Sequence, residues 1–381
     1  MNISIVVPSF PLFVRSNEFG LAKSLVDLGH RVNIITTSVK SGRELMDTKT
    51  FKESVPQNFE VNYVPNLIDI FWETNPFVYG ISEYVKESDV VLLQEDYPFI
   101  CHKAFHECKK KGIPTTVSSE HITWNKNFFV RNIYKVYDLA TNKKLREGVN
   151  AITAHCTAAK EFWINELGVR RGVEVIHVGV DTQLFQPKKV EKLNLLEGKF
   201  KILTVARATP VKGLRYLIEA MVYVSKRVSG VKCYILGKGS EREKLGTLVN
   251  KLQLGSVVSF IDKAIPNRQM PELYSQCDIY VQPSITEPFG IAVLEAMACR
   301  KPVVGTNVGG MRDTIEDGVS GYRVEPMNSR ELGEKITKLL LDPEKMEEMG
   351  KNARERAKKF DWKIIGQKYN KLIEKVVQKE V

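Results

Sequence analysis

Two glutamates in the C-terminal half of the sequence have the type and spacing to bind a phosphorylated sugar. Glu287 and Glu295 stand eight positions apart, with Gly290 between them. The segment follows an apolar strand, crosses a turn with two prolines and is expected to open a helix at about 289–290. Backbone N–H groups and the positive dipole end at a helix start suit an anionic phosphate. Because carboxylates accept hydrogen bonds from sugar hydroxyls, the pattern predicts a pocket for a molecule carrying both groups, such as a nucleotide sugar.

The alternative interpretation of these glutamates is structural, with Glu287 capping the helix and Glu295 as a solvated helix residue. Two cations favour the functional interpretation. Arg207 and Lys212 stand five positions apart in another strand–turn–helix segment, and both could reach a diphosphate. Neutralising a leaving phosphate as a C–O bond breaks is the electrostatic help that transfer from a nucleotide sugar needs. A purely structural role explains these cations less well, because the helix dipole disfavours positive charge at a helix start.

These two segments resemble elements of a known enzyme family. Segment 287–295 resembles the Glu-x7-Glu motif of the retaining glycosyltransferases of family four, which have the two-domain GT-B fold. Arg207 and Lys212 resemble the family's Arg-x4-Lys-Gly element. The resemblance covers residues 205–326 well and the N-terminal half more thinly.

The resemblance adds roles to those that the residue types suggest. Arg207 and Lys212 are expected to bind the diphosphate, Glu287 the sugar hydroxyls and Glu295 the ribose. His121 aligns with the family's active-site histidine, which meets the transferred sugar. The expected catalytic residues are therefore His121, Glu287, Arg207 and Lys212, and the expected donor-binding residues are Gly239, Ile261, Asp262, Phe289, Gly290, Ile291 and Glu295.

The sequence departs from the family pattern at several positions. Asp262 stands where a glycine is usual, in the stretch expected to give backbone contacts to the base. Val178 replaces the usual asparagine. Family members commonly have a Gly-Gly pair in the first loop, whereas residues 8–17 here contain no glycine. Side chains in this loop keep the backbone farther from a phosphate than glycines would. Because the family's loop contacts the donor phosphate and the acceptor, this departure leaves the acceptor undefined by the sequence.

Alternating apolar strands and helices predict an α/β protein with two facing Rossmann-like domains and a cleft between them. We expect an N-terminal, acceptor-side domain at 1–187 and a nucleotide-sugar-binding domain at 188–360, with the helix 361–381 returning to brace the first. The expected strands are 3–7, 31–36, 90–93, 114–118, 150–154 and 173–177 in the first domain, and 202–205, 231–236, 257–261, 279–281 and 302–305 in the second.

Length and composition agree with an ordinary globular protein. The 381 residues carry a formal charge of +11, which favours anionic partners without choosing among them. No apolar run approaches the ~18 residues of a membrane span, and the start of the chain lacks signal-peptide features, so a cytoplasmic protein is expected. The six cysteines form no CxxC pair. His102 and His106 have metal-ligand spacing on one face of an expected helix, but no second cluster completes a site.

The sequence therefore predicts a retaining, metal-independent hexosyltransferase. It would move a hexose from a UDP- or GDP-linked sugar to an acceptor hydroxyl of a glycan, lipid or small molecule, without a cofactor. Two alternatives stay open: a sugar-nucleotide epimerase on the same fold, and a basic module that binds membrane or nucleic acid. Residues 124–137 mix aromatics with cations and suit peripheral membrane contact or, alternatively, packing on the first domain. No nucleic-acid partner is expected for the transferase.

Overall fold

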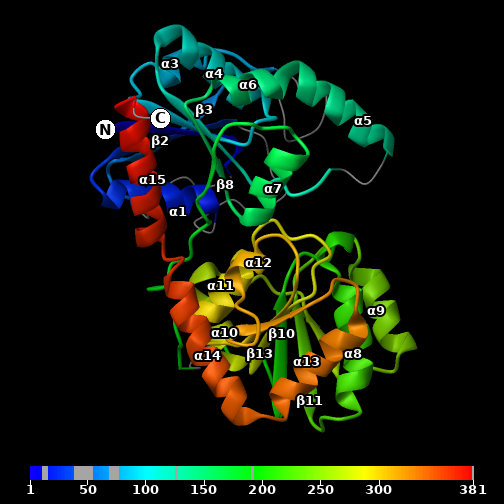
Figure 1. Cartoon of the computed structure of the whole chain (residues 1–381). Coiled ribbons are helices and arrows are strands. Elements are labelled where there is room, and N and C mark those ends of the chain that lie inside the picture. The colour runs from blue at the N-terminus through cyan, green and yellow to red at the C-terminus, as the bar shows by residue number, and fades with distance from the viewer. Residues whose placement is uncertain (11–15, 38–54, 68–76, 125–127, 190–192, 380–381) are drawn as a thin grey trace. The chain divides into compact units, whose positions relative to one another are not determined.

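The computed structural model describes residues 1–10, 16–37, 55–67, 77–124, 128–189 and 193–379. The chain forms two compact units (Figure 1). Unit 1 combines Met1–Gly179 with Trp362–Val381, and unit 2 is Val180–Asp361. The predicted α/β class with two Rossmann-like domains is confirmed, since each unit contains its own parallel sheet with helices.

Unit 1 is built on a seven-stranded sheet in which neighbouring strands are parallel. The central strands are continuous apolar runs, as expected where helices cover both faces. Ile3 and Val90, which are in register on neighbouring strands, are both buried. In order across the sheet the strands are β3 (Phe59–Val64), β2 (Arg31–Thr37), β1 (Asn2–Ser9), β6 (Val90–Gln94), β7 (Thr115–Ser119), β8 (Ala151–Ala154) and β9 (Val173–Val175).

The remaining elements of unit 1 are mostly helices that connect these strands. One antiparallel pair, β4 (Asn66–Leu67) with β5 (Phe77–Val78), lies outside the main sheet. The helices are α1 (Asn17–Asp27), α3 (Ser82–Val85), α4 (Phe99–Lys111), α5 (Phe128–Tyr137), a π-helical turn (Asp138–Asn142), α6 (Lys143–Gly148), α7 (Thr157–Asn165) and α15 (Trp362–Val377).

The C-terminal helix α15 packs against α1 at the start of the chain (Figure 1). The Trp362 indole fits against two glycines: an added Cβ at Gly20 or Gly179 would fall within 2.1 or 2.4 Å of ring atoms. Further along, a Cβ added at Gly366 would fall within 2.6 Å of the Ser24 hydroxyl oxygen. Small residues on one side therefore make room for the large ring and for close approach of the two helices.

Unit 2 repeats the parallel α/β pattern on a six-stranded sheet. Its strands, in order across the sheet, are β12 (Val258–Ile261), β11 (Val231–Leu236), β10 (Phe200–Val205), β13 (Ile279–Gln282), β14 (Val303–Thr306) and β15 (Gly321–Val324). Its helices are α8 (Leu214–Ser225), α9 (Arg242–Lys251), α10 (Met270–Gln276), α11 (Ile291–Ala298), α12 (Met311–Thr314), α13 (Ser329–Leu340) and α14 (Pro343–Lys358), with 3₁₀ turns at Pro210–Lys212 and Asn267–Gln269.

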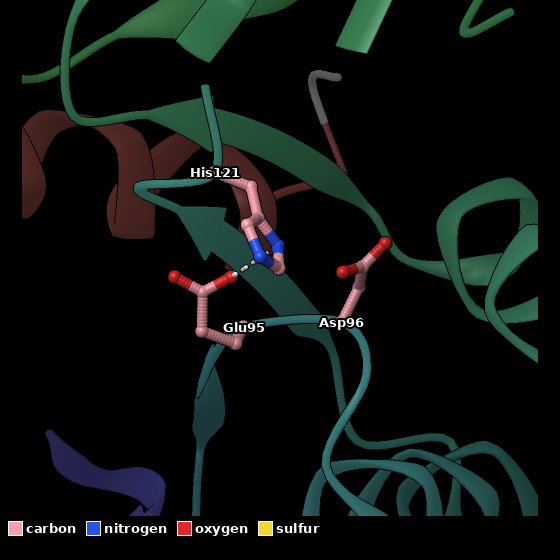
Figure 2. A group of neighbouring side chains, drawn as sticks. All are labelled: Glu95, Asp96 and His121. Carbon is pink, nitrogen blue, oxygen red and sulfur yellow. Dashed lines mark ion pairs between the residues drawn. The ribbon is translucent and has the colours of Figure 1, made fainter. Parts of the chain in front are cut away.

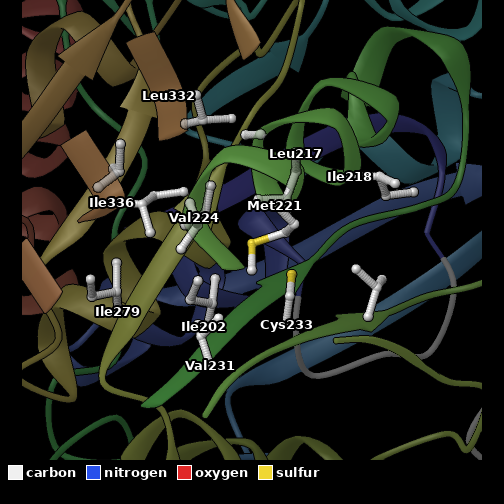
Figure 3. Packing of buried hydrophobic residues seen from close by; sticks show 14 of the residues in the cluster. Ile202, Leu217, Ile218, Met221, Val224, Val231, Cys233, Ile279, Leu332 and Ile336 are labelled. Atoms are coloured by element: carbon white, nitrogen blue, oxygen red, sulfur yellow. The ribbon is translucent and has the colours of Figure 1, made fainter. Parts of the chain in front are cut away.

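The core of unit 2 forms where strand side chains meet α8 and α13 (Figure 3). Ile202 of β10 is in register with Cys233 on one side and Ile279 on the other, and all three are buried. Met221 of α8 and Ile336 of α13 pack in the same cluster. This rigid layer fixes the strands whose carboxyl ends carry the candidate site.

The structure adds two edge strands, β3 and β15, that the sequence analysis did not predict. β3 buries only its two end residues, Phe59 and Val64, rather than forming a continuous apolar run, and β15 is only four residues long. Within the described residues, no helix is long and apolar enough to cross a membrane. Most of the glycine-poor first loop, residues 11–15, lies outside the described residues.

The fit between Trp362 and Gly20 predicts opposite effects for two glycine replacements. Gly20→Ala in α1 should lower the free energy of unfolding by about 1–3 kcal/mol, because the new methyl overlaps the indole. Gly246→Ala in α9, where the Cβ meets only the tip of Arg242, should raise it by roughly 0.5–1 kcal/mol through helix propensity. Urea unfolding of both variants measures the difference. A neutral Gly20→Ala would contradict the packing described here.

Candidate functional site

A buried ion pair joins two loops at the carboxyl edge of the unit 2 sheet. The Lys212 ammonium lies 2.8 Å from Oε2 of Glu287, and their side chains are only 15% and 9% exposed. The loops meet through the backbone as well, because the N–H groups of Ile285 and Thr286 donate to the carbonyl of Val211. Two residues 75 positions apart in sequence are thus held together by neighbouring parallel strands, β10 and β13.

Gly213 allows this close approach of the loops. Its φ of +61° is in the left-handed region, and an added Cβ would come within 2.1 Å of the Pro283 carbonyl oxygen. A side chain at this position would force the loops apart, and with them Lys212 and Glu287. The glycine that follows the lysine is therefore part of the geometry that forms the ion pair.

Two further polar side chains hold the Glu287 carboxylate. Ser284 Oγ and Gln282 Nε2 donate to the same oxygen as Lys212, over 2.9 and 3.3 Å. Among the described residues, no donor approaches the other oxygen, Oε1. This arrangement orients the carboxylate and keeps one oxygen available to a ligand hydroxyl.

Sequence reasoning missed Gln282 and Ser284. The Tyr280 hydroxyl donates to Gln282 Oε1 over 2.7 Å, so a buried chain of hydrogen bonds runs from β13 to Glu287. The available signal was a glutamine and a serine directly after an apolar strand, at the sheet edge where ligands bind in open α/β sheets.

Helix α11 begins at Ile291, and its N-cap is Gly290 with φ +90°. The first N–H groups of a helix have no intrahelical acceptor, and no side chain caps this end. Glu287 is therefore not a helix cap: its carboxylate faces Lys212 instead. The Phe289 ring is buried and packs edge-on against Phe360, with 6.2 Å between centroids, so its side chain supports the turn from within.

Glu295 is buried inside unit 2 rather than solvated. Its side chain accepts a 2.7 Å hydrogen bond from the Tyr274 hydroxyl, and the residue is 1% exposed. The structural alternative of a solvated helix residue is wrong for this position. The proposed contact with a ribose needs a ligand that reaches beside Tyr274, deeper than Glu287.

Arg207 is exposed on the loop after β10. The neighbouring residues bond to the next loop: Ala206 N–H donates to Leu236 O, and Ala208 N–H donates to Lys238 O. Gly239 lies against this loop, where an added Cβ would come within 2.4 Å of the Ala208 carbonyl oxygen. The loop is held by its backbone, while Arg207 makes no ion pair with any described residue.

Ile261 and Asp262 lie at the end of β12. Asp262 receives two hydrogen bonds from Arg242, at 3.1 and 3.0 Å, and these bonds lower the pKa of its carboxyl. The same guanidinium stacks over the Phe260 ring, 3.8 Å from its centroid. The side chain that replaces the usual glycine is thus paired with Arg242, and any contact to a base would involve the backbone here.

His121 of unit 1 belongs to a separate polar group with Glu95 and Asp96 (Figure 2). Its Nδ1 lies 4.0 Å from Glu95 Oε2, and its ring is half exposed. Glu95 follows β6 with φ +78° and accepts hydrogen bonds from Ser119 Oγ and from the Glu120 N–H. The carboxyl ends of β6 and β7 therefore bring these groups together.

Two different environments control the carboxyl groups of this cluster. Burial raises the pKa of Glu95 to about 7, and the nearby Asp96 charge adds to the effect. Asp96 itself is buried against Arg146 at 2.5 Å, and the same guanidinium also binds Asp138. Arg146 thus pairs with Asp96, while the Glu95 carboxyl, with its raised pKa, changes its charge near neutral pH.

Glu95, Asp96 and His121 are also the one group among the described residues whose ligand atoms lie close enough to hold a metal ion. Their chemistry fits a cation poorly, because Arg146 already occupies Asp96 and a metal ion would compete with the proton that burial favours on Glu95. His102 and His106 of α4, which have metal-ligand spacing in the sequence, have separate environments. His102 is hydrogen-bonded to Asn142 at 3.0 Å, and His106 is exposed.

Comparison with known proteins places this fold and these motifs in a family. A profile of glycosyl transferases group 1 matches residues 185–356, and one of glycosyltransferase family 4 matches residues 19–184. A D-inositol 3-phosphate glycosyltransferase of Segniliparus rotundus is 30% identical over 197 residues, which are 50% of this chain and 44% of that protein. The chain spans about half the length of the curated relatives it matches.

Solved structures share the fold over the whole chain. Sucrose-phosphate synthase from Thermosynechococcus elongatus aligns with a TM-score of 0.78 at 19% identity, covering 100% of both chains. Anabaena HepE in complex with UDP aligns with a TM-score of 0.77 at 21% identity, covering 98% of this chain and 100% of that one. At such identities the likeness concerns the fold alone.

Two Rossmann-like units with these matches define a transferase of the GT-B class. Within that class, the chain belongs to the family-four type of glycosyltransferases.

The raised pKa of Glu95 predicts how one residue changes stability with pH. Because its pKa is about 7 in the folded protein and near 4.5 in the unfolded chain, the folded state holds the proton more tightly. The favourable contribution of Glu95 to the free energy of unfolding is fully present below about pH 4.5 and is lost as the pH rises through about 7. Between pH 4.5 and 8, the free energy of unfolding of Glu95→Gln should therefore rise by on the order of 3 kcal/mol relative to that of the wild type.

Chemical unfolding at several pH values measures this difference. Glu87→Gln, which changes an exposed carboxylate of the same unit, provides the control and should follow the wild-type curve. Parallel curves for Glu95→Gln and wild type would contradict the raised pKa.

Proposed function

We propose that this protein is a retaining hexosyltransferase that uses a nucleotide-diphosphate sugar, linked to UDP or GDP, as donor. The observation that carries the proposal is the Lys212–Glu287 pair beside the uncapped start of α11. It combines a cation for the diphosphate, a carboxylate for sugar hydroxyls and free helix N–H groups within one loop cluster. Anabaena HepE, which shares the fold, has been solved with UDP and with UDP-glucose, and this supports the choice of donor class.

In this proposal the protein stabilises charge rather than forming a covalent intermediate. The bond between the anomeric carbon and the diphosphate oxygen breaks, and its electron pair stays on the diphosphate. Lys212 and Arg207 neutralise that developing charge. The acceptor oxygen then bonds to the same face of the anomeric carbon and passes its proton to the diphosphate, which accounts for retention without a protein base.

The remaining residues position the donor. Glu287 would bind sugar hydroxyls through Oε1, since Lys212, Ser284 and Gln282 hold its other oxygen. Glu295 would bind the ribose, and Ile261 and Asp262 would meet the base through their backbone. His121 would contact the transferred sugar, and no metal or cofactor takes part.

Binding of the donor can be tested first. A UDP-, GDP- or ADP-sugar that binds only the folded state should raise the melting temperature, and at 100 times its Kd the stabilisation is about 2.7 kcal/mol. Thermal unfolding with each sugar nucleotide identifies the base and the sugar. If none of them shifts the transition, the proposed donor class is wrong.

Removing either member of the ion pair should slow transfer. Once the donor is identified, transfer can be measured as the rate of nucleotide release in the presence of a panel of acceptors. Glu287→Ala or Lys212→Ala should reduce this rate by a factor on the order of 10² or more. Glu334→Ala, which removes a carboxylate from an exposed ion pair on α13, should leave the rate unchanged. Full activity in both site variants would refute these roles.

Two further readouts separate the proposal from its alternatives. NMR of the product's anomeric coupling reports retention or inversion. Incubation with donor alone distinguishes an epimerase, which would convert the sugar nucleotide without needing an acceptor.

A further inference from the structure

Helix α5 of unit 1 presents an unusual row of exposed apolar side chains. Phe129, Ile133 and Val136 are spaced by four and three positions, so they share one face of the helix. Two more large apolar side chains lie at the ends of this row: Phe128 beside Phe129, and Leu139 in the π-helical turn that follows α5. The exposed fractions of the five side chains are Phe128 (60%), Phe129 (76%), Ile133 (68%), Val136 (68%) and Leu139 (67%).

Such a grouping stands out against the rest of the described surface. Other large exposed hydrophobic side chains, such as Tyr79, Met327 and Leu341, are dispersed along the sequence, as is normal for a folded protein. Five within twelve residues, at higher exposure than most of these, form a concentrated apolar surface. An exposed apolar surface of this kind usually marks contact with a partner or a membrane.

Cations accompany the apolar row. Arg131 and Lys135 lie on the side of α5 away from Phe129, Ile133 and Val136, and Lys143 and Lys144 follow on α6. The acidic residues of this stretch offset one of these four cations. Glu147 pairs with Lys143 over 3.9 Å at the protein surface, whereas Asp138 is buried against Arg146.

A cavity of about 610 Å³ adjoins this region between α4 and the segment that follows α5. Phe99, Phe105 and Tyr137 provide apolar and aromatic walls, and Lys109 and Lys144 add two cations. Tyr137 ends α5, so the cavity is continuous with the helix that carries the exposed row. The combination of apolar walls with ammonium groups suits an amphiphile with an anionic head.

We propose that α5 binds the surface of an anionic lipid bilayer. An amphipathic helix with large apolar residues on one face and cations on its polar face lies in the plane of the interface, where its apolar face enters the acyl boundary. The neighbouring lysines face anionic headgroups, each of which adds to the attraction. α5 lies far from α15 within unit 1, with its long side free of other helices (Figure 1).

The charges favour lipid over the other candidates for this surface. A second copy of the chain would bring the same cations face to face, which opposes association through α5. Nucleic acid would use the cations, but it gives no favourable environment to aliphatic Ile133, Val136 and Leu139. An anionic bilayer satisfies both the apolar and the charged parts of the surface.

Vesicle flotation of the full chain tests the proposal. The protein should float with vesicles of phosphatidylcholine and phosphatidylglycerol and much less with phosphatidylcholine alone. The exposed double variant Phe129→Ser/Ile133→Ser should lower the partition coefficient at least about tenfold, because two large apolar groups no longer enter the membrane. Lys135→Gln/Lys143→Gln should weaken binding at low salt and have little effect at high salt.

Matched variants show whether the effect belongs to this surface. Leu341→Ser and Lys244→Gln remove an exposed apolar side chain and an exposed cation from unit 2, and both should float like wild type. Equal flotation of Phe129→Ser/Ile133→Ser and wild type would overturn the proposal. So would a concentration-dependent dimer that this variant dissociates while vesicle binding stays absent, since α5 would then be a contact between copies.

Discussion

The candidate site of unit 2 depends on one buried ion pair between loops that are far apart in sequence. A carboxylate and an ammonium with so little exposure are stable only together, because either charge left alone in the interior is strongly unfavourable. Gln282 and Ser284 add hydrogen bonds that fix the Glu287 carboxylate, and backbone bonds from Ile285 and Thr286 fix the loop that carries Lys212. Charge, hydrogen bonding and loop geometry therefore support the same arrangement.

In unit 1, polar side chains also gather at the carboxyl ends of parallel strands, here β6 and β7. The carboxyl groups of this cluster, however, differ in whether a cation pairs with them. Arg146 binds Asp96 and Asp138 in the interior and holds both carboxyl groups in place. No lysine or arginine among the described residues pairs with Glu95, and burial therefore favours its protonated form. The result is a group beside His121 whose charge changes near neutral pH, at the sheet edge where ligands gather in this fold.

The two proposed roles of unit 1, contact of His121 with the sugar and membrane binding by α5, use different parts of its surface. The group at the ends of β6 and β7 is polar and partly buried, whereas α5 has an apolar, exposed face and carries cations on its other side. An acceptor that is itself a lipid would make membrane binding and transfer serve one reaction. With a soluble acceptor, the same helix would serve only to locate the enzyme at the bilayer.

The sequence by itself determined the α/β class, the duplicated strand–helix pattern and the loops that carry Glu287 and Lys212, because apolar periodicity and glycine placement act locally. It missed β3, which is buried only at its ends, and β15, which is four residues long, because such edge strands gain stability only from the strand beside them. It also could not show that Glu295 is buried against Tyr274, that Asp262 pairs with Arg242, or that Gln282 and Ser284 hold Glu287. Those contacts join residues through the register of parallel strands and the packing of loops, which only the tertiary structure decides.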